Sequence, residues 1–308
     1  MTAFSTQLAA GLSYQFHPEV WVLVGFLTAA YVYMVRVIGP KAVEPGQPVV
    51  SRANVVTFTM AMLMLWIASD WPIHDISEDY LYWVHMMQHM ALTYFLPPLV
   101  LMATPTWLAR LLIGDGRLYL VVKWFTHPVV AAVVFNSAIM ILHIPLLVNE
   151  SVGNGPLHYL LHVLVVLTAL LMWSVVCGPI PEFRIGAGGA MIYLFAQSII
   201  PTVPAAWLVF AEDPVYRAYD RPDRLWGIDV ISDQQLAGAL MKVAGGMYLW
   251  GVVIYLFATR FAANQGDDYD FKRKGRIPAS EITGHDELPL TTEDIERAFA
   301  ETAPPPEP

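Results

Sequence analysis

Seven apolar stretches, each about long enough to cross a bilayer, constrain the fold of this chain most. A helix needs about 20 mostly apolar residues to span the hydrocarbon core, and the stretches run through residues 20–38, 53–69, 80–103, 128–148, 156–177, 187–210 and 235–257. Of the 308 residues, 56% are hydrophobic and only 14% are charged, which is unusual for a soluble domain. The sequence therefore predicts an all-α polytopic membrane helix bundle with about seven transmembrane helices.

Polar sequence is concentrated at the C-terminal end. We expect residues 1–260 to form the seven-helix transmembrane domain and residues 261–308 to form a cytoplasmic acidic tail that is largely disordered, because its ending ETAPPPEP cannot build a core. The formal net charge is −9, and much of the acid lies in the tail after Phe261, which argues against a basic nucleic-acid surface. We therefore expect membrane lipid around the bundle and no nucleic-acid partner. The single cysteine, Cys177, excludes an intrachain disulfide and a CxxC metal motif.

Lysine and arginine fall mainly in alternate connections between the predicted spans. Short loops on the cytoplasmic side of a membrane carry an excess of these residues. The basic connections hold Arg36, Lys41, Arg52, Arg110, Arg117, Lys123 and Arg184. The opposite connections carry only Arg217, Arg221 and Arg224, all in the segment before the last span. We therefore expect the N-terminus outside and the C-terminus in the cytoplasm.

Five histidines are predicted to lie in one layer of the membrane. His85 and His89 in the third span, and His158 and His162 in the fifth, have i, i+4 spacing, which places both rings of a pair on one helix face. With His143 in the fourth span, all five fall within about 13 Å of the outer ends of their spans. Ionisable residues at membrane depth are costly and indicate function. We predict that at least three of the five face a common cavity between spans three, four, five and seven.

The residue types around this layer favour copper. Imidazole suits copper, zinc and iron, whereas thioether sulfur selects Cu(I). Three methionines near the histidines are further candidate ligands, namely Met86, Met90 and Met241. Asp233, at the outer mouth of the last span, is a candidate either for a helix N-cap or for accepting a hydrogen bond from a ligand histidine.

The order of these motifs resembles that of the seven-helix CtaG-type cytochrome c oxidase assembly factors. In that family the third span carries H-M-x-Q-H-M, which appears here as HMMQHM from His85 and is followed by Pro97 and Pro98. The family's H-x-P at the end of span four corresponds here to His143 and Pro145, and its paired histidines in span five correspond to His158 and His162. Its D-Q-x-x-x-G-x-x-M opening of the last span corresponds to Asp233, Gln234, Gly238 and Met241. The resemblance covers roughly residues 71–256.

The resemblance implies a multi-pass protein of the bacterial plasma membrane that is not an enzyme and that helps to mature a haem-copper oxidase through copper handling. Cu(I) is the metal expected, and the expected partners are cytochrome c oxidase subunits or other copper chaperones. The full set of candidate metal-site residues is His85, Met86, His89, Met90, His143, His158, His162, Asp233 and Met241.

Other functions are also compatible with the histidine layer. A b-type haem protein would use histidines of spans three and five as axial ligands. A copper permease would need a polar path across the bilayer, and only His127 lies at the cytoplasmic end of a span. A scaffold would use the histidines only to contact oxidase subunits or haem-biosynthesis partners. A retinal protein, which seven spans and Lys242 would fit, lacks an acidic counter-ion inside the third span.

Overall fold

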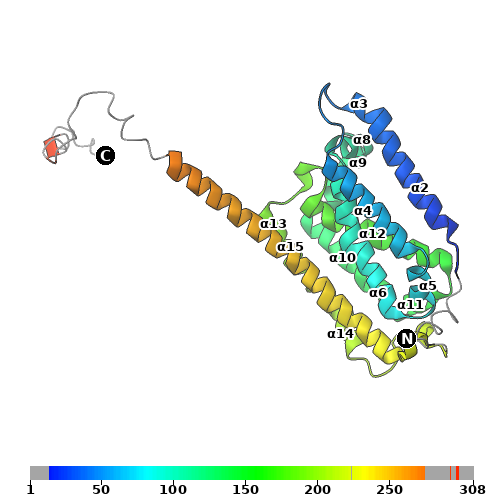
Figure 1. The fold of residues 1–308 in the computed structure, drawn as a ribbon. Helices are drawn as coiled ribbons and strands as arrows, with labels where there is room; N and C mark the ends of the chain where they lie inside the picture. The colour runs from blue at the N-terminus through cyan, green and yellow to red at the C-terminus, as the bar shows by residue number, and fades with distance from the viewer. Residues whose placement is uncertain (1–13, 223, 275–291, 293–295, 298–308) are drawn as a thin grey trace, which may run out of the picture. The chain divides into compact units, whose positions relative to one another are not determined.

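The computed structural model describes residues 14–222, 224–274, 292 and 296–297. Every regular element within these residues is a helix, which confirms the predicted all-α fold (Figure 1). The main helices are α2 (Pro18–Tyr33), α3 (Gly39–Ala42), α4 (Arg52–Ser69), α5 (Ile73–Asp79), α6 (Tyr82–Met90), α7 (Leu96–Ala103), α8 (Thr106–Ile113), α9 (Arg117–Phe125), α10 (Pro128–Leu142), α11 (Pro145–Val152), α12 (Gly155–Cys177), α13 (Ala187–Gln197), α14 (Thr202–Val209) and α15 (Val230–Lys274).

The described helices are those of a polytopic membrane protein. Five helical segments are long and apolar enough to span a bilayer, and the number is seven if each of two bent pairs counts as one span. In these pairs α8 bends away from α6–α7 by 96°, and α10 bends away from α9 by 72°. Large apolar side chains face outward, such as Phe26, Ile192 and Phe210, which are 68%, 72% and 81% exposed. Lipid is the solvent that such a surface fits.

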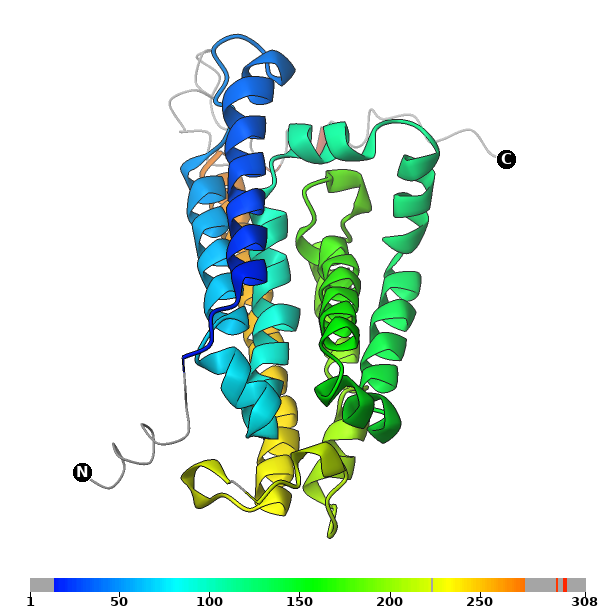
Figure 2. The same ribbon diagram turned by 90° about the vertical axis from the view of Figure 1, so that its right-hand side faces the viewer.

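Successive spans run in opposite directions, so that alternate connections lie at the same end of the bundle (Figure 2). Helices α5 and α11 and the connection 210–229 lie at one end, whereas α3, α8 and α9 lie at the other. The predicted basic connections therefore lie at the end opposite to α5 and α11, whereas the connection 210–229, with its three arginines, lies at the same end as α5 and α11.

Pro97 and Pro98 shape the third span by removing backbone donors. The helix does not break; it continues from α6 to α7 through a π-helical turn, Ala91–Phe95. Because Pro97 has no N–H to donate four residues back, the carbonyl of Thr93 is left without its helical partner. The Trp173 indole Nε1 donates to this carbonyl at 3.0 Å, which ties α12 to the third span.

The fourth span ends earlier than predicted, and this change positions a histidine. Helix α10 ends at Leu142 rather than near residue 148, because Ile144 precedes Pro145 and adopts an extended conformation that proline favours in its neighbour. A new helix, α11, then starts at Pro145. His143 is left at the C-cap of α10, at the bend between the two helices.

The chain divides into two units, residues 1–257 and 258–308, and α15 runs from the first into the second. The predicted disordered tail from residue 261 lies largely outside the described residues and stays a prediction. In the first unit, the largest buried apolar cluster joins α10, α12, α13 and α15, with Phe135, Trp173, Leu194 and Leu249 among its members. Val165, the first buried member of this cluster on α12, lies three residues after His162, so on this helix the core begins where the histidine layer ends.

Candidate metal centre

The five predicted histidines come together from three helices. His85 and His89 project from α6, His158 and His162 from α12, and His143 from the C-cap of α10. The ring centroids of each i, i+4 pair lie 4.4 and 4.3 Å apart, and the His89 and His162 rings lie 4.8 Å apart across the two helices. All five side chains line one cavity of about 20 Å³. The five histidines therefore converge as their depth predicted, at a cavity between the third, fourth and fifth spans. The seventh span, which was also predicted to line this cavity, contributes none of its lining residues in the described part of the chain.

Four of these histidines carry a buried ring nitrogen that has no hydrogen-bond partner among the described residues. These atoms are His85 Nδ1, His143 Nε2, His158 Nε2 and His162 Nε2. At His143 the cause is visible, because Nδ1 donates to the Ile139 carbonyl at 2.7 Å and so leaves Nε2 as the nitrogen with a free lone pair. Buried polar atoms are nearly always paired, and four exceptions in one cluster fit a site built for a ligand that accepts these lone pairs.

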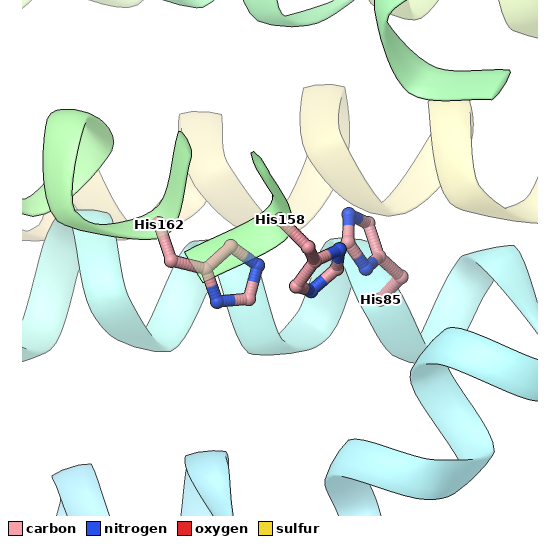
Figure 3. A group of neighbouring side chains, drawn as sticks. All are labelled: His85, His158 and His162. Carbon is pink, nitrogen blue, oxygen red and sulfur yellow. The ribbon is translucent and has the colours of Figure 1, made fainter. Parts of the chain in front are cut away.

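His85, His158 and His162 form the tightest group. Figure 3 shows the two α12 histidines facing His85 on the neighbouring helix. One nitrogen from each ring lies within 4.8 Å of the others. Imidazole nitrogens bind a metal at about 2.0–2.1 Å, so small side-chain rotations bring all three within reach of a single ion. Among the described residues, no carboxylate lines this cavity. Its nitrogen donors are therefore neutral imidazoles without a negative charge beside them.

A second cavity of about 40 Å³ brings the three predicted methionines together. Met86, Met90 and Met241 line it with His89 and His143. The two cavities share Met86 and both of these histidines. The thioethers thus lie beside the imidazole cluster, on the side toward the apolar core, where they are placed to act as additional soft donors.

Asp233 occupies a different place from the one predicted. Its carboxylate accepts the backbone N–H groups of Tyr82 and Trp83 at 3.0 and 2.9 Å, and the Arg224 guanidinium at 3.1 Å. Tyr82 and Trp83 are the first two residues of α6, whose N–H groups have no acceptor within the helix. Asp233 therefore caps α6 from a neighbouring helix and holds the start of the helix that carries His85.

Sequence reasoning did not assign a role to the connection 210–229. Tyr219 lines the histidine cavity and donates through its hydroxyl to the Ser77 carbonyl at 2.9 Å. The Tyr216 hydroxyl donates to the His143 carbonyl at 3.0 Å. Gln234 fixes this connection by accepting from the Tyr216 N–H and donating to the Tyr216 carbonyl. The Asp-Gln pair at the start of the last span thus supports the cavity rather than lining it.

Gln88, the glutamine of the HMMQHM motif, joins α5 to the third span. Its amide donates to the Ala68 carbonyl at 2.7 Å, and its oxygen accepts from the Ser77 hydroxyl at 2.9 Å. Its Nε2 also lies 3.4 Å from His74 Nδ1. On the other side of that ring, His74 Nε2 lies 3.2 Å from the Glu78 carboxylate. Burial raises the pKa of Glu78, but the hydrogen bond with His74 and the nearby imidazoles outweigh it, and the net pKa lies below the ordinary value.

The sizes of the cavities distinguish among the functions left open. A volume of about 10–15 Å³ holds one water molecule, so the 20 Å³ cavity that all five histidines line accommodates a single ion and not a haem. A larger apolar groove of about 500 Å³ is lined by only two of the described histidines, His74 and His162.

Beyond Tyr94 the described part of the bundle interior is mostly apolar around Phe135 and Trp173, and its buried polar groups include the hydrogen-bonded Asn136 and Gln197 amides between α10 and α13. This mostly apolar interior is unfavourable for a polar path to the other end, which a permease would need.

These features define a polytopic helical membrane protein with a histidine-lined cavity near one end of its bundle. A family model described as cytochrome c oxidase caa3 assembly factor matches residues 29–262, which is more than half of the chain. The chain belongs to this cytochrome c oxidase caa3 assembly factor family, as its motifs predicted. Membership implies that it acts with components of that oxidase. A search of curated proteins and a search of solved structures each found no match.

Proposed function

We propose that this assembly factor binds Cu(I) in the histidine cavity and supplies it to a haem-copper oxidase. The observation that carries the proposal is the group of four buried imidazole nitrogens without hydrogen-bond partners around a cavity of ion size. His85, His158 and His162 are the primary ligands. His89 and His143 lie close enough to replace one of them as the ion moves.

The donor set favours Cu(I) over harder ions. With neutral imidazole ligands a Cu(I) site keeps a net charge of only +1, which costs less to bury than the +2 that a divalent ion would carry without a counter-charge from the described residues of this cavity. The thioethers of Met86, Met90 and Met241 add soft donors on the inner side. The protein acts as a binding and transfer factor, with oxidase subunits or other copper chaperones as its partners, and no chemical conversion is assigned to it.

We also propose that the chain lies in the plasma membrane with the histidine cavity toward the outside. The basic residues Arg36, Lys41, Arg110 and Arg117 lie at the opposite end of the bundle, which the positive-inside rule assigns to the cytoplasm. Reporter fusions at Gly153, between α11 and α12, should therefore read external. Fusions at Gly116, between α8 and α9, should read cytoplasmic, and the reverse pattern would exclude an outward-facing cavity.

The copper proposal is tested with His85→Ala and His162→Ala, with His127→Ala as the matched control. His127 is an exposed histidine at the N-cap of α10, at the other end of the bundle. In purified full-length protein, the first two variants should lose Cu(I) affinity while His127→Ala keeps it. In cells, the same two variants should reach the membrane at normal levels and lower oxidase activity.

Two results would separate the parts of this proposal. Unchanged Cu(I) affinity in His85→Ala and His162→Ala would remove the metal site. Lost Cu(I) binding with full oxidase activity would leave the site in place and remove its role in supplying the oxidase.

A further inference from the structure

A second group of metal-binding side chains lies beside the histidine cavity, at the same end of the bundle. It consists of His74 and Glu78, one turn apart on α5, and His158 on α12. One ligand atom from each lies within 4.8 Å of the others. The His74 and His158 ring centroids are 5.9 Å apart, and His74 Nε2 is 3.2 Å from Glu78 Oε2.

The burial of these residues is that of a built site with access to solvent. His74 and His158 are 3% and 2% exposed, whereas the side chain of Glu78 is 23% exposed and forms the outer edge of the group. His158 Nε2 is buried without a hydrogen-bond partner among the described residues. A cation arriving from water thus meets the carboxylate first and finds a free imidazole lone pair behind it.

Neighbouring side chains hold the His74 ring from several directions. The His17 ring packs edge-on against it at 4.9 Å, and His17 Nε2 makes a 2.7 Å contact with Asp75 on α5. The Tyr159 ring stacks on it at 6.0 Å. The Gln88 Nε2 atom lies 3.4 Å from His74 Nδ1. The other ring nitrogen, His74 Nε2, is directed to Glu78. These contacts fix the orientation of the His74 ring.

We propose that His74, Glu78 and His158 form a second metal site, which takes a divalent first-row cation of the zinc or copper(II) type. Two imidazoles and one carboxylate are a donor set that such cations bind well. The carboxylate supplies the negative charge that the inner cavity lacks, so the two sites differ in the charge of the ion they prefer.

His158 belongs to both groups, and this sharing couples the two sites. An ion that takes His158 into the outer group removes it from His85 and His162. Filling the outer site therefore lowers the Cu(I) affinity of the inner cavity, and Cu(I) lowers the affinity of the outer site by the same factor. This coupling rests on the proposed function, whereas the outer site stands on its own contacts.

The test is zinc binding by the purified, untagged full chain, measured by equilibrium dialysis for the wild type, Glu78→Gln and Asp79→Asn. Asp79 is the next residue, a half-exposed carboxylate paired with Arg221, and serves as the matched control. Loss of an outer partner of a metal ligand costs about 10–100-fold in affinity, so removal of the ligand carboxylate should cost at least about tenfold. Asp79→Asn should bind zinc as the wild type does.

Three further measurements keep the inference separate from the proposed function. His85→Ala, which belongs only to the inner group, should keep its zinc affinity. Glu78→Gln should keep its Cu(I) affinity, which also shows that it is folded, and His158→Ala should weaken both. Should Glu78→Gln fail to fold, His74→Gln tests the same site through its other α5 ligand.

Zinc affinity unchanged by Glu78→Gln or His74→Gln would overturn the second site, whatever the result for copper. Zinc affinity lost in His85→Ala but kept in Glu78→Gln would place the zinc in the inner cavity and would overturn it equally. Lost zinc binding in Glu78→Gln, combined with a wild type that binds no Cu(I), would support the second site and refute the proposed function.

Discussion

Replacing Asp233 with asparagine should destabilise the end of the bundle that holds the histidines. The carboxylate is fully buried, accepts two N–H groups at the start of α6 and pairs with Arg224, whose side chain is 15% exposed. Asparagine has one acceptor oxygen, so one of the two backbone bonds is lost, and a hydrogen bond to a charged group contributes about 1.5–3 kcal/mol. Breaking a buried ion pair by removing one partner costs about 3–5 kcal/mol.

These two costs overlap, and Arg224 keeps the carbonyls of Tyr219 and Ile228 as acceptors. We therefore expect Asp233→Asn to lower the free energy of unfolding by about 3 kcal/mol, the lower end of the range for a broken buried pair. Asp229→Asn is the matched control, because this aspartate of the same segment is exposed and accepts the N–H groups of Ile231 and Ser232 of its own helix.

Unfolding in mixed detergent micelles, followed by tryptophan fluorescence, measures the difference between the two variants. Asp233→Asn should lose clearly more stability than Asp229→Asn. Equal losses in the two variants would refute the assignment of Asp233 as the cap that anchors α6.

Three other outcomes are expected. Gly238→Ala should lower the free energy of unfolding by about 1–3 kcal/mol, because the added Cβ would lie 2.6 Å from the Ala205 carbonyl oxygen. Gly246→Ala should leave the stability unchanged, because no neighbouring atom lies within 4 Å of the added Cβ. Equal losses of stability in the two variants would contradict this close packing at Gly238. Met241→Leu should weaken Cu(I) binding in a chelator competition, because Met241 lines the second cavity. Met247 is 70% exposed, so Met247→Leu should bind Cu(I) as the wild type does. Equal Cu(I) affinities in the two variants would exclude the Met241 thioether as a ligand. The purified protein should show no haem absorption band, since the cavity is of ion size, and a band at stoichiometric intensity would restore the haem alternative.

The spans and the histidine layer could be predicted because both depend on properties that a sequence carries directly. Apolar length determines which segments cross the bilayer. In antiparallel spans, the rise per residue then gives the depth of each side chain below the membrane surface. This depth is similar for His85, His143 and His158, so their convergence could be predicted. Pro145 also carried a local signal for the end of α10, although the span was predicted to continue past it.

The role of Asp233 and the part played by α5 could not be predicted in the same way. Depth placed Asp233 at the level of the cavity, but the direction of its side chain depends on the rotation of α15, which packing decides. His74 and Glu78 lie in a short connection, where hydropathy says nothing about the path of the chain. Their i, i+4 spacing was visible in the sequence, and only the fold of α5 against α6 and α12 places them beside His158.

Copper K-edge absorption spectroscopy tests the central claim most directly. Full-length untagged protein would be loaded with one equivalent of Cu(I) and desalted before measurement. The histidine cavity predicts bound copper whose nearest shell contains imidazole nitrogens, and this imidazole signal should fall in His85→Ala and His162→Ala but not in His127→Ala. Copper that is removed by desalting, or a shell without imidazole in the wild type, would contradict a copper site formed by these histidines.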